Sequence, residues 1–415
     1  MRNIILTIIL ITFSSFLTFG QEDNIVEIIN ENAFEIKETN PKNEFNKSEK
    51  LDSIFKNVKI FGFGEATHGT KEFFDLKIKF FKYLVKNQGV KNFAIEASFG
   101  NCIEIDNYIK GKDADPKKLI RKMGFWTWNN EEVLYLIEWM KKYNLNKKKF
   151  EQLNFYGIDI MDSSNSAVLI SKFIENNPFK NKESYLNILA KYISRKNSNN
   201  LKQKELAKHL KSMLELRKSI EKNYSEEKKY LSMQTAIIQY INFRLDYNQE
   251  KRDRGMSENI TQILNTDNNN NKVFIWAHNF HIKKNKITYT NDYSMGHFLK
   301  EKYGEKYYSI GFDFAIGSFY ALNIKDNRIK KYSISKPMKN TSSEIFNKSN
   351  LNTFFLDFNS ISYNKIMNEF LNTKIKYRGI GSTYSPKMIE KEKLLDAFDG
   401  IIFVKKTNES TYLRK

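Results

Sequence analysis

Short apolar runs that alternate with helical patterns constrain the fold of this chain more than any other feature of its sequence. Continuous apolar runs are typical of strands buried on both faces of a sheet. The segments between the first three runs repeat apolar residues every three to four positions, as in FFDLKIKFFKYLVKN, and such strand–helix–strand alternation is typical of parallel sheets. The sequence therefore predicts an α/β fold with a mostly parallel central sheet flanked by helices. The runs are VKIFGFG (58–64), NFAIEA (92–97), LNFYGIDI (153–160), KVFIWAH (272–278), YYSIGFDF (307–314) and GIIFV (400–404).

Residues 163–265 interrupt this alternation. They include LAKHLKSMLELRKSIEKN and TAIIQYINFRL, which have helical periodicity and lack strand signals. We predict a long helical insertion, or lid, that walls the cleft of the α/β domain. The insertion divides that domain into residues 52–162 and 266–415, and the polar residues 21–51 are expected to form an N-terminal helix and linker.

The first twenty residues have the pattern of a secretory signal peptide. Arg2 is followed by an apolar stretch, and Thr18 and Gly20 provide small residues before QEDN. An uncleaved membrane anchor is the alternative. The single cysteine of the chain, Cys102, is far from this segment, so the lipoprotein route is excluded. We expect a secreted or periplasmic protein without a stable membrane span once residues 1–20 are removed.

The chain is strongly basic, with a formal net charge of +20. Such a balance is compatible with nucleic-acid binding. However, the lysines are spread along the whole chain, and neither a zinc-finger spacing nor an RNP-type motif is present. We therefore interpret the charge as a solvated lysine-rich surface and expect no nucleic-acid partner.

Acidic and imidazole side chains follow four consecutive predicted strands. Ligands of open α/β sheets bind outside the carboxyl ends of the strands, so these side chains are expected to meet at one edge. An unpaired charge after a buried strand is costly, which implies that these groups pair with one another, with a ligand or with a metal. The residues are Glu65 and His68 at the end of the first strand, Glu96 at the end of the second, Asp159 at the end of the third, and His278 with His281 at the end of the fourth.

Several common catalytic motifs are missing from the sequence. It contains no GxSxG elbow, no HExxH, no CxxC and no GxxxxGK[ST]. An acid–imidazole site without an evident nucleophile suits general-base activation of water. Two alternatives stay open: a metal-dependent hydrolase that uses the same Glu/His cluster, and a non-catalytic envelope binding protein with the same fold.

Motifs along most of the chain resemble the erythromycin esterase family. They begin near residue 50, occur in the order of that family, and form a highly specific combination. They are GEATHGTKEFF, AIEAS, WNNEEVLYLIEWMKKYN, NFYGIDI, RDRGMSENI, WAHNFHI, RGIGSTYSP and FDGIIFVKKT.

The resemblance implies a hydrolase that cleaves an ester without a cofactor, and in the founding members the ester is a macrolide lactone. It also implies that His68 is the general base and that Glu65, Glu96 and His278 support it. Where the family has an arginine nine residues after the base, this chain has Lys77, which keeps the charge but loses the planar fork of donors. Lys77 and His278 are the candidate oxyanion stabilisers. The candidate substrate-binding residues are Lys77, Glu72, Asp159, Arg252 and His281, and no residue is assigned to a metal.

Overall fold

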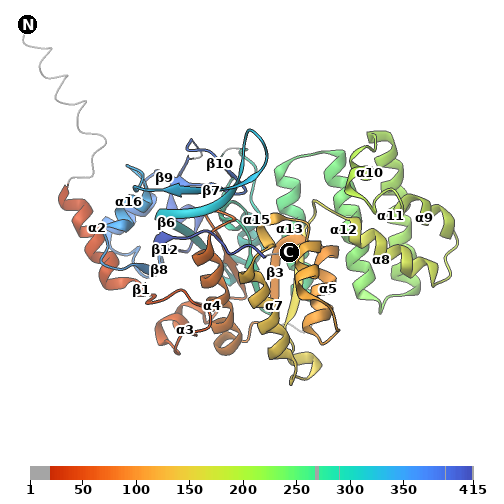
Figure 1. Cartoon of the computed structure of the whole chain (residues 1–415), viewed down its shortest axis with the longest axis horizontal. Coiled ribbons are helices and arrows are strands. Elements are labelled where there is room, and N and C mark those ends of the chain that lie inside the picture. The colour runs from red at the N-terminus through yellow and green to blue at the C-terminus, as the bar shows by residue number, and fades with distance from the viewer. Residues whose placement is uncertain (1–18, 267–270, 289, 388, 414–415) are drawn as a thin grey trace, which may run out of the picture.

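The computed structural model describes residues 19–266, 271–288, 290–387 and 389–413, shown in Figure 1. The predicted signal peptide falls almost entirely on residues 1–18, which lie outside the described residues. No helix in the described part of the chain has the length and apolarity that a membrane crossing requires.

A ten-stranded sheet forms the centre of the molecule (Figure 1). Eight of its strands lie in the order β1-β8-β12-β6-β2-β5-β3-β4, and all neighbours from β12 to β4 are parallel. All six predicted strands are present, and the predicted fold class is confirmed. The antiparallel strands β8 and β7 were not predicted. The strands of this sheet are β1 (Phe34–Glu35), β2 (Ile60–Phe63), β3 (Asn92–Ser98), β4 (Asn154–Asp159), β5 (Val273–Trp276), β6 (Tyr307–Asn323), β7 (Ile329–Ile334), β8 (Thr353–Asp357), β10 (Thr383–Tyr384) and β12 (Gly400–Thr407).

The register of the parallel strands places the carboxyl ends of β2, β3, β4 and β5 near one another, whereas β6 continues beyond them. Phe63 of β2 pairs with Trp276 of β5 and with Ile310 of β6, and Ile95 of β3 pairs with Trp276 from the other side. Gly157 of β4 continues this row next to Ile95. The residues that follow these strands therefore meet at a single edge of the sheet, as the sequence predicts.

Each face of the sheet is covered by helices and has its own hydrophobic core. In β2, Phe61 and Phe63 point into one core and Ile60 into the other, which is the alternation expected of a strand buried on both faces. The first core includes α3 (Glu49–Phe55), α4 (Lys71–Gln88), α5 (Phe99–Ile109), α6 (Pro116–Lys122) and α7 (Glu131–Asn144). The second includes α2 (Phe19–Asn32), α13 (Gln249–Asn265), α14 (Asn279–Ile282), α15 (Met295–Tyr303), α16 (Ser342–Asn347), α17 (Lys365–Asn372) and α18 (Leu394–Ala397).

The helical insertion forms a separate unit at the end of the molecule opposite α2 (Figure 1). Its helices, together with Ile103 of α5, form a third hydrophobic core that contains Met213, Leu216 and Ile237. The last helix of the predicted insertion, α13, instead packs against the sheet through Met256 and Ile260. The helices of the separate unit are α8 (Ser164–Glu175), α9 (Lys182–Leu189), α10 (Arg195–Asn199), α11 (Gln203–Asn223) and α12 (Lys228–Leu245).

Candidate active site

Glu65 and His68 form a hydrogen-bonded pair directly after β2. Glu65 is fully buried, and its Oε1 lies 2.5 Å from Nδ1 of His68. Because a carboxylate only accepts, the proton of this bond belongs to Nδ1, which leaves the lone pair of Nε2 unused. Trp276 of β5 donates its indole N–H to the second oxygen of Glu65 at 2.9 Å. His68 is thus held in one orientation and one tautomer.

Lys77 lies beneath this pair and is fully buried. Its ammonium group forms an ion pair with Glu65 and lies 4.2 Å from the centre of the Trp276 ring. Burial lowers the pKa of Lys77 to about 8, although Glu65 opposes the shift. The structure therefore places Lys77 outside the cavity, as a partner of Glu65 and not as a group that a substrate or an oxyanion can reach.

A second charged cluster lies at the carboxyl ends of β3 and β4. Arg252 of α13 donates to Glu96 at 2.7 Å and to both oxygens of Asp159, at 3.1 and 2.8 Å. His281 lies 3.1 Å from Glu96 and 2.8 Å from Asp253. Burial alone would raise the pKa of Glu96, but His281 and Arg252 hold that pKa well below its ordinary value.

His281 is cationic within this cluster. Burial favours the neutral imidazole, but the carboxylates of Asp253 and Glu96 outweigh it and raise the pKa of His281 to about 10. Asp253 also accepts the backbone N–H of Met295 at 2.7 Å. The cluster is therefore a compact set of paired charges, in which each carboxylate faces at least one cation.

His278 lies between the two clusters. Its ring centre is 5.0 Å from that of His68, and its backbone N–H donates to Glu96 at 2.9 Å. Backbone N–H groups face both ring nitrogens: that of Phe280 faces Nδ1 and that of Gly381 faces Nε2, each at 3.1 Å. An imidazolium offers no lone pair to either group. Burial, together with His68, lowers the pKa of His278 well below its ordinary value, so this ring is neutral.

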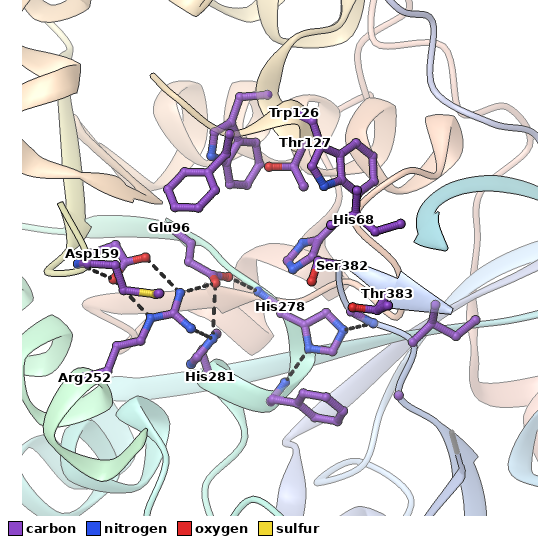
Figure 2. Close-up of a pocket in the computed structure, with 18 of the residues that line it drawn as sticks. His68, Glu96, Trp126, Thr127, Asp159, Arg252, His278, His281, Ser382 and Thr383 are labelled. Atoms are coloured by element: carbon purple, nitrogen blue, oxygen red, sulfur yellow. Dashed lines mark hydrogen bonds and ion pairs between the residues drawn. The ribbon is translucent and has the colours of Figure 1, made fainter. Parts of the chain in front are cut away.

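A cavity of about 730 Å³ opens above these residues (Figure 2). His68, Glu96, Asp159, Arg252, His278 and His281 all line it, so the structure brings together most of the candidates that were predicted from the sequence. Its other walls come from the 3-10 helix η1 (Trp126–Trp128), the segment 379–383 and strand β11 (Ile389–Glu392), which pairs with β9 (Ile375–Arg378).

Three of the nine predicted residues, Glu65, Lys77 and Glu72, do not line the cavity. Glu65 is fully buried and contacts it only through His68. Lys77 is buried below Glu65, as described above. Glu72 accepts the backbone N–H of Asn408 and its side-chain amide, each at 2.7 Å, and so fixes the C-terminal segment to α4 instead of lining the cavity. The prediction that the helical insertion walls the cleft is wrong, because Arg252 of α13 is the one residue of 163–265 that lines it.

The sequence alone did not indicate several other residues that line the cavity, among them Ser382 and Thr383. Ser382 and Thr383 point toward the cavity near His68 in Figure 2, and the backbone N–H of His68 donates to Gly381 at 3.3 Å. The motif RGIGSTYSP contains both residues, but their hydroxyl groups carry no signal that separates them from ordinary turn residues. Phe280, Ile380 and Ile389 make much of the wall apolar.

Fold and site together define an α/β protein with an acid–imidazole pair and a charged cluster in a cavity at the carboxyl edge of its sheet. The erythromycin esterase family model matches residues 85–407, and the chain belongs to that family. The match includes Glu96, Asp159, Arg252 and His278, whereas Glu65 and His68 precede it.

Curated relatives match nearly the full length of the chain. The erythromycin esterase type II of Escherichia coli is 24% identical over 92% of this chain and 98% of its own length. A putative hydrolase of Bacillus subtilis, YbfO, is 23% identical over 88% of this chain and 87% of its own. These relatives support a hydrolase at low identity.

Solved structures share the fold. The crystal structure of a succinoglycan biosynthesis protein has a TM-score of 0.85 and 23% identity over 96% of this chain and all of that one. A mutant of the erythromycin esterase EreC in its open conformation has a TM-score of 0.67 and 14% identity, over 92% of this chain and 99% of that one. At such identities the likeness shows the fold alone.

Proposed function

We propose that this protein hydrolyses a carboxylic ester with a water molecule that His68 activates. The hydrogen bond from Nδ1 of His68 to Glu65 is the observation that carries the proposal. It leaves Nε2 as the acceptor that a water in the cavity can use, and it stabilises the imidazolium that forms when the water is deprotonated. Membership of the erythromycin esterase family supports the same reaction class.

In this mechanism Nε2 of His68 takes a proton from water while the water oxygen adds to the acyl carbon. The tetrahedral intermediate collapses as the bond to the alkoxide breaks. The Nε2–H of the imidazolium then protonates the alkoxide, which leaves as an alcohol and restores the neutral ring. Glu65 stays ionised throughout, because Lys77 and Trp276 both stabilise its negative charge.

The hydroxyl groups of Ser382 and Thr383 are the donors that we assign to the oxyanion. His278 is neutral with both ring nitrogens facing backbone groups, and Lys77 is buried against Glu65. Ser382 and Thr383 line the same cavity as His68, on the segment whose backbone pairs with it. Donors placed where charge develops are commonly worth about 10²–10³ in turnover.

The metal-dependent alternative makes a different prediction for the same residues. Glu65 and Glu96, the two carboxylates that a metal would need, are engaged with Lys77 and with Arg252 and His281. Exhaustive chelation is therefore expected to leave hydrolysis unchanged. Activity that is lost on chelation and restored by Zn²⁺ or Mn²⁺ would favour the metal-dependent mechanism.

The decisive experiment incubates the purified protein with macrolides and with simple aryl and alkyl esters, and follows each by mass spectrometry. We expect at least one ester to gain the mass of one water. Binding of these compounds without turnover by the wild-type protein would instead support the non-catalytic alternative. The His68→Asn variant in the same panel controls for contaminating esterases.

A further inference from the structure

The wall that β11 contributes to the cavity contains a buried carboxylate that lacks a hydrogen-bond partner on one oxygen. Glu390 is 7% exposed and lines the cavity. Within the described part of the chain, its Oε2 is buried and makes no hydrogen bond. The ammonium group of Lys283 lies 3.7 Å from this oxygen, within ion-pair distance but beyond a hydrogen bond.

Lys283 is already engaged with a second carboxylate. It forms a close ion pair with Glu392, the next inward-pointing residue of β11. Glu392 also accepts hydrogen bonds from Thr288 at 2.8 Å and from Asn285 at 3.1 Å. One buried cation thus faces two buried carboxylates, and an uncompensated buried charge is expensive.

The pKa of Glu390 responds to this imbalance. Burial raises it, Lys283 opposes the shift, Glu392 raises it again, and a hydrogen bond with Thr288 lowers it by less. A buried carboxylate in this situation is stabilised either by a proton or by a cation that enters from the cavity.

The buried groups around the whole cavity have the same imbalance, although the chain has a formal net charge of +20. Carboxylates outnumber the cations that lie among them, because His68 and His278 are neutral in the proposed mechanism. The carboxylates are Glu65, Glu96, Asp159, Asp253, Glu390 and Glu392, and the cations are Lys77, Arg252, Lys283 and His281.

We propose that Glu390 forms a subsite for a cationic group of the substrate, so that the preferred substrate is an ester that also carries an amine or a quaternary ammonium. This inference rests on the proposed function, since it names the substrate class of the same cavity. Phe280 and Ile389 line the cavity together with Glu390, and apolar and aromatic surface suits the alkyl groups of a substituted ammonium. Lys387 lines the cavity as well, but its side chain is exposed and it provides the natural control.

Matched esters test the subsite. One ester ends in a trimethylammonium group and the other in a tert-butyl group of the same shape, and kcat/KM is measured for both. We expect wild-type protein to prefer the cationic ester and Glu390→Gln to lower that preference about tenfold, which corresponds to about 1.4 kcal/mol. Lys387→Gln should keep or increase the preference.

Calorimetric binding of the trimethylammonium alcohol separates this inference from the proposed function. Binding that depends on Glu390, in a protein that hydrolyses neither of these esters nor any ester of the panel above, would refute the esterase mechanism and retain the subsite. Hydrolysis of both esters by wild-type protein without preference for the cationic one would overturn the subsite. The comparison of the two esters uses wild-type protein, so it tests the subsite even if Glu390→Gln fails to fold.

Discussion

At the scale of single residues, the site depends on how a buried acid is kept ionised. Glu65 has no exposed surface, yet it must be a carboxylate to hold Nδ1 of His68. Lys77 supplies the compensating charge from below, and Trp276 adds a neutral donor. Lys77 therefore acts on Glu65, and we expect any effect of Lys77 on catalysis to be exerted through the orientation of His68.

His68→Asn is expected to lower turnover by about 10²–10⁴, because the substitution removes the base and keeps a side chain of similar size. The melting temperature should change little, since His68 lies at the cavity wall. His297→Asn is the matched control: His297 stacks on Tyr293 at 4.1 Å between ring centres and does not line the cavity. Normal turnover by His68→Asn on an ester that wild-type protein hydrolyses would refute the mechanism.

The raised pKa of His281 predicts how stability depends on pH. With a pKa of about 10 in the folded protein and about 6.5 when unfolded, His281 keeps its proton in the folded state between these values. Its stabilising contribution is complete below pH 6.5 and is lost as the pH rises through 10. The difference in the free energy of unfolding between wild type and His281→Gln should therefore shrink over this range.

Urea titrations of both proteins from pH 6 to 10.5 measure this difference. We expect it to fall by about 1.4 kcal/mol or more, the equivalent of one pKa unit. Lys77 titrates in the same range but is present in both proteins, so its contribution cancels. A difference that stays constant or grows with pH would show that His281 is neutral in the folded protein.

At the scale of the elements, the segment 379–383 connects the two histidines of the site. Gly381 has a φ of +58°, donates its N–H toward Nε2 of His278 and accepts the N–H of His68. An added Cβ would come no closer than 3.8 Å to other atoms, so alanine is opposed by the backbone conformation and not by lack of space.

Gly381→Ala is expected to cost about 1 kcal/mol of stability and to lower kcat by about tenfold, as the segment shifts relative to the histidines. Gly89→Ala is a matched control, because Gly89 ends α4 with a φ of +68° and open space around it, and it does not line the cavity. It should cost similar stability and leave kcat unchanged. Equal kcat values for the two variants would mean that the segment does not position the site.

The sequence predicts the elements whose apolar pattern is local and misses those that depend on long-range packing. The strands that contain or precede Glu65, Glu96 and His278 are short apolar runs in the sequence. Because acids and histidines stand at the ends of these runs, the sequence predicts that these side chains meet at one edge of the sheet. Helix α13 has the same periodicity as its predecessors, so nothing local shows that it packs on the sheet. Glu390 and Ser382 belong to a stretch without apolar periodicity, and only the fold brings them to the cavity.

At the scale of the whole molecule, distant parts of the chain build the cavity while the insertion stays apart. Residues from 68 to 161 and residues from 252 to 390 both line it, and they contact each other there, as Asp159 does with Arg252. Helices α8 to α12 bury their apolar residues in the third core, which also includes Ile103 of α5, at one end of the molecule (Figure 1). The site is therefore complete only when the strands that precede the insertion in the sequence have paired with the strands that follow it.

We propose that the protein is exported and that its mature form begins at Gln21. Helix α2 lies at the opposite end of the molecule from the insertion, and its Ile25 and Ile29 are fully buried against the core that also contains β8 (Figure 1). Cleavage after Gly20 keeps both isoleucines, whereas cleavage several residues later would remove part of that core and cost about 2–5 kcal/mol for each lost side chain. Intact-mass analysis of protein recovered from the native envelope measures the start directly. We expect a chain that begins at Gln21; one that still begins at Met1 would contradict export by a cleaved signal, and one that begins beyond Ile25 would contradict the packing of α2.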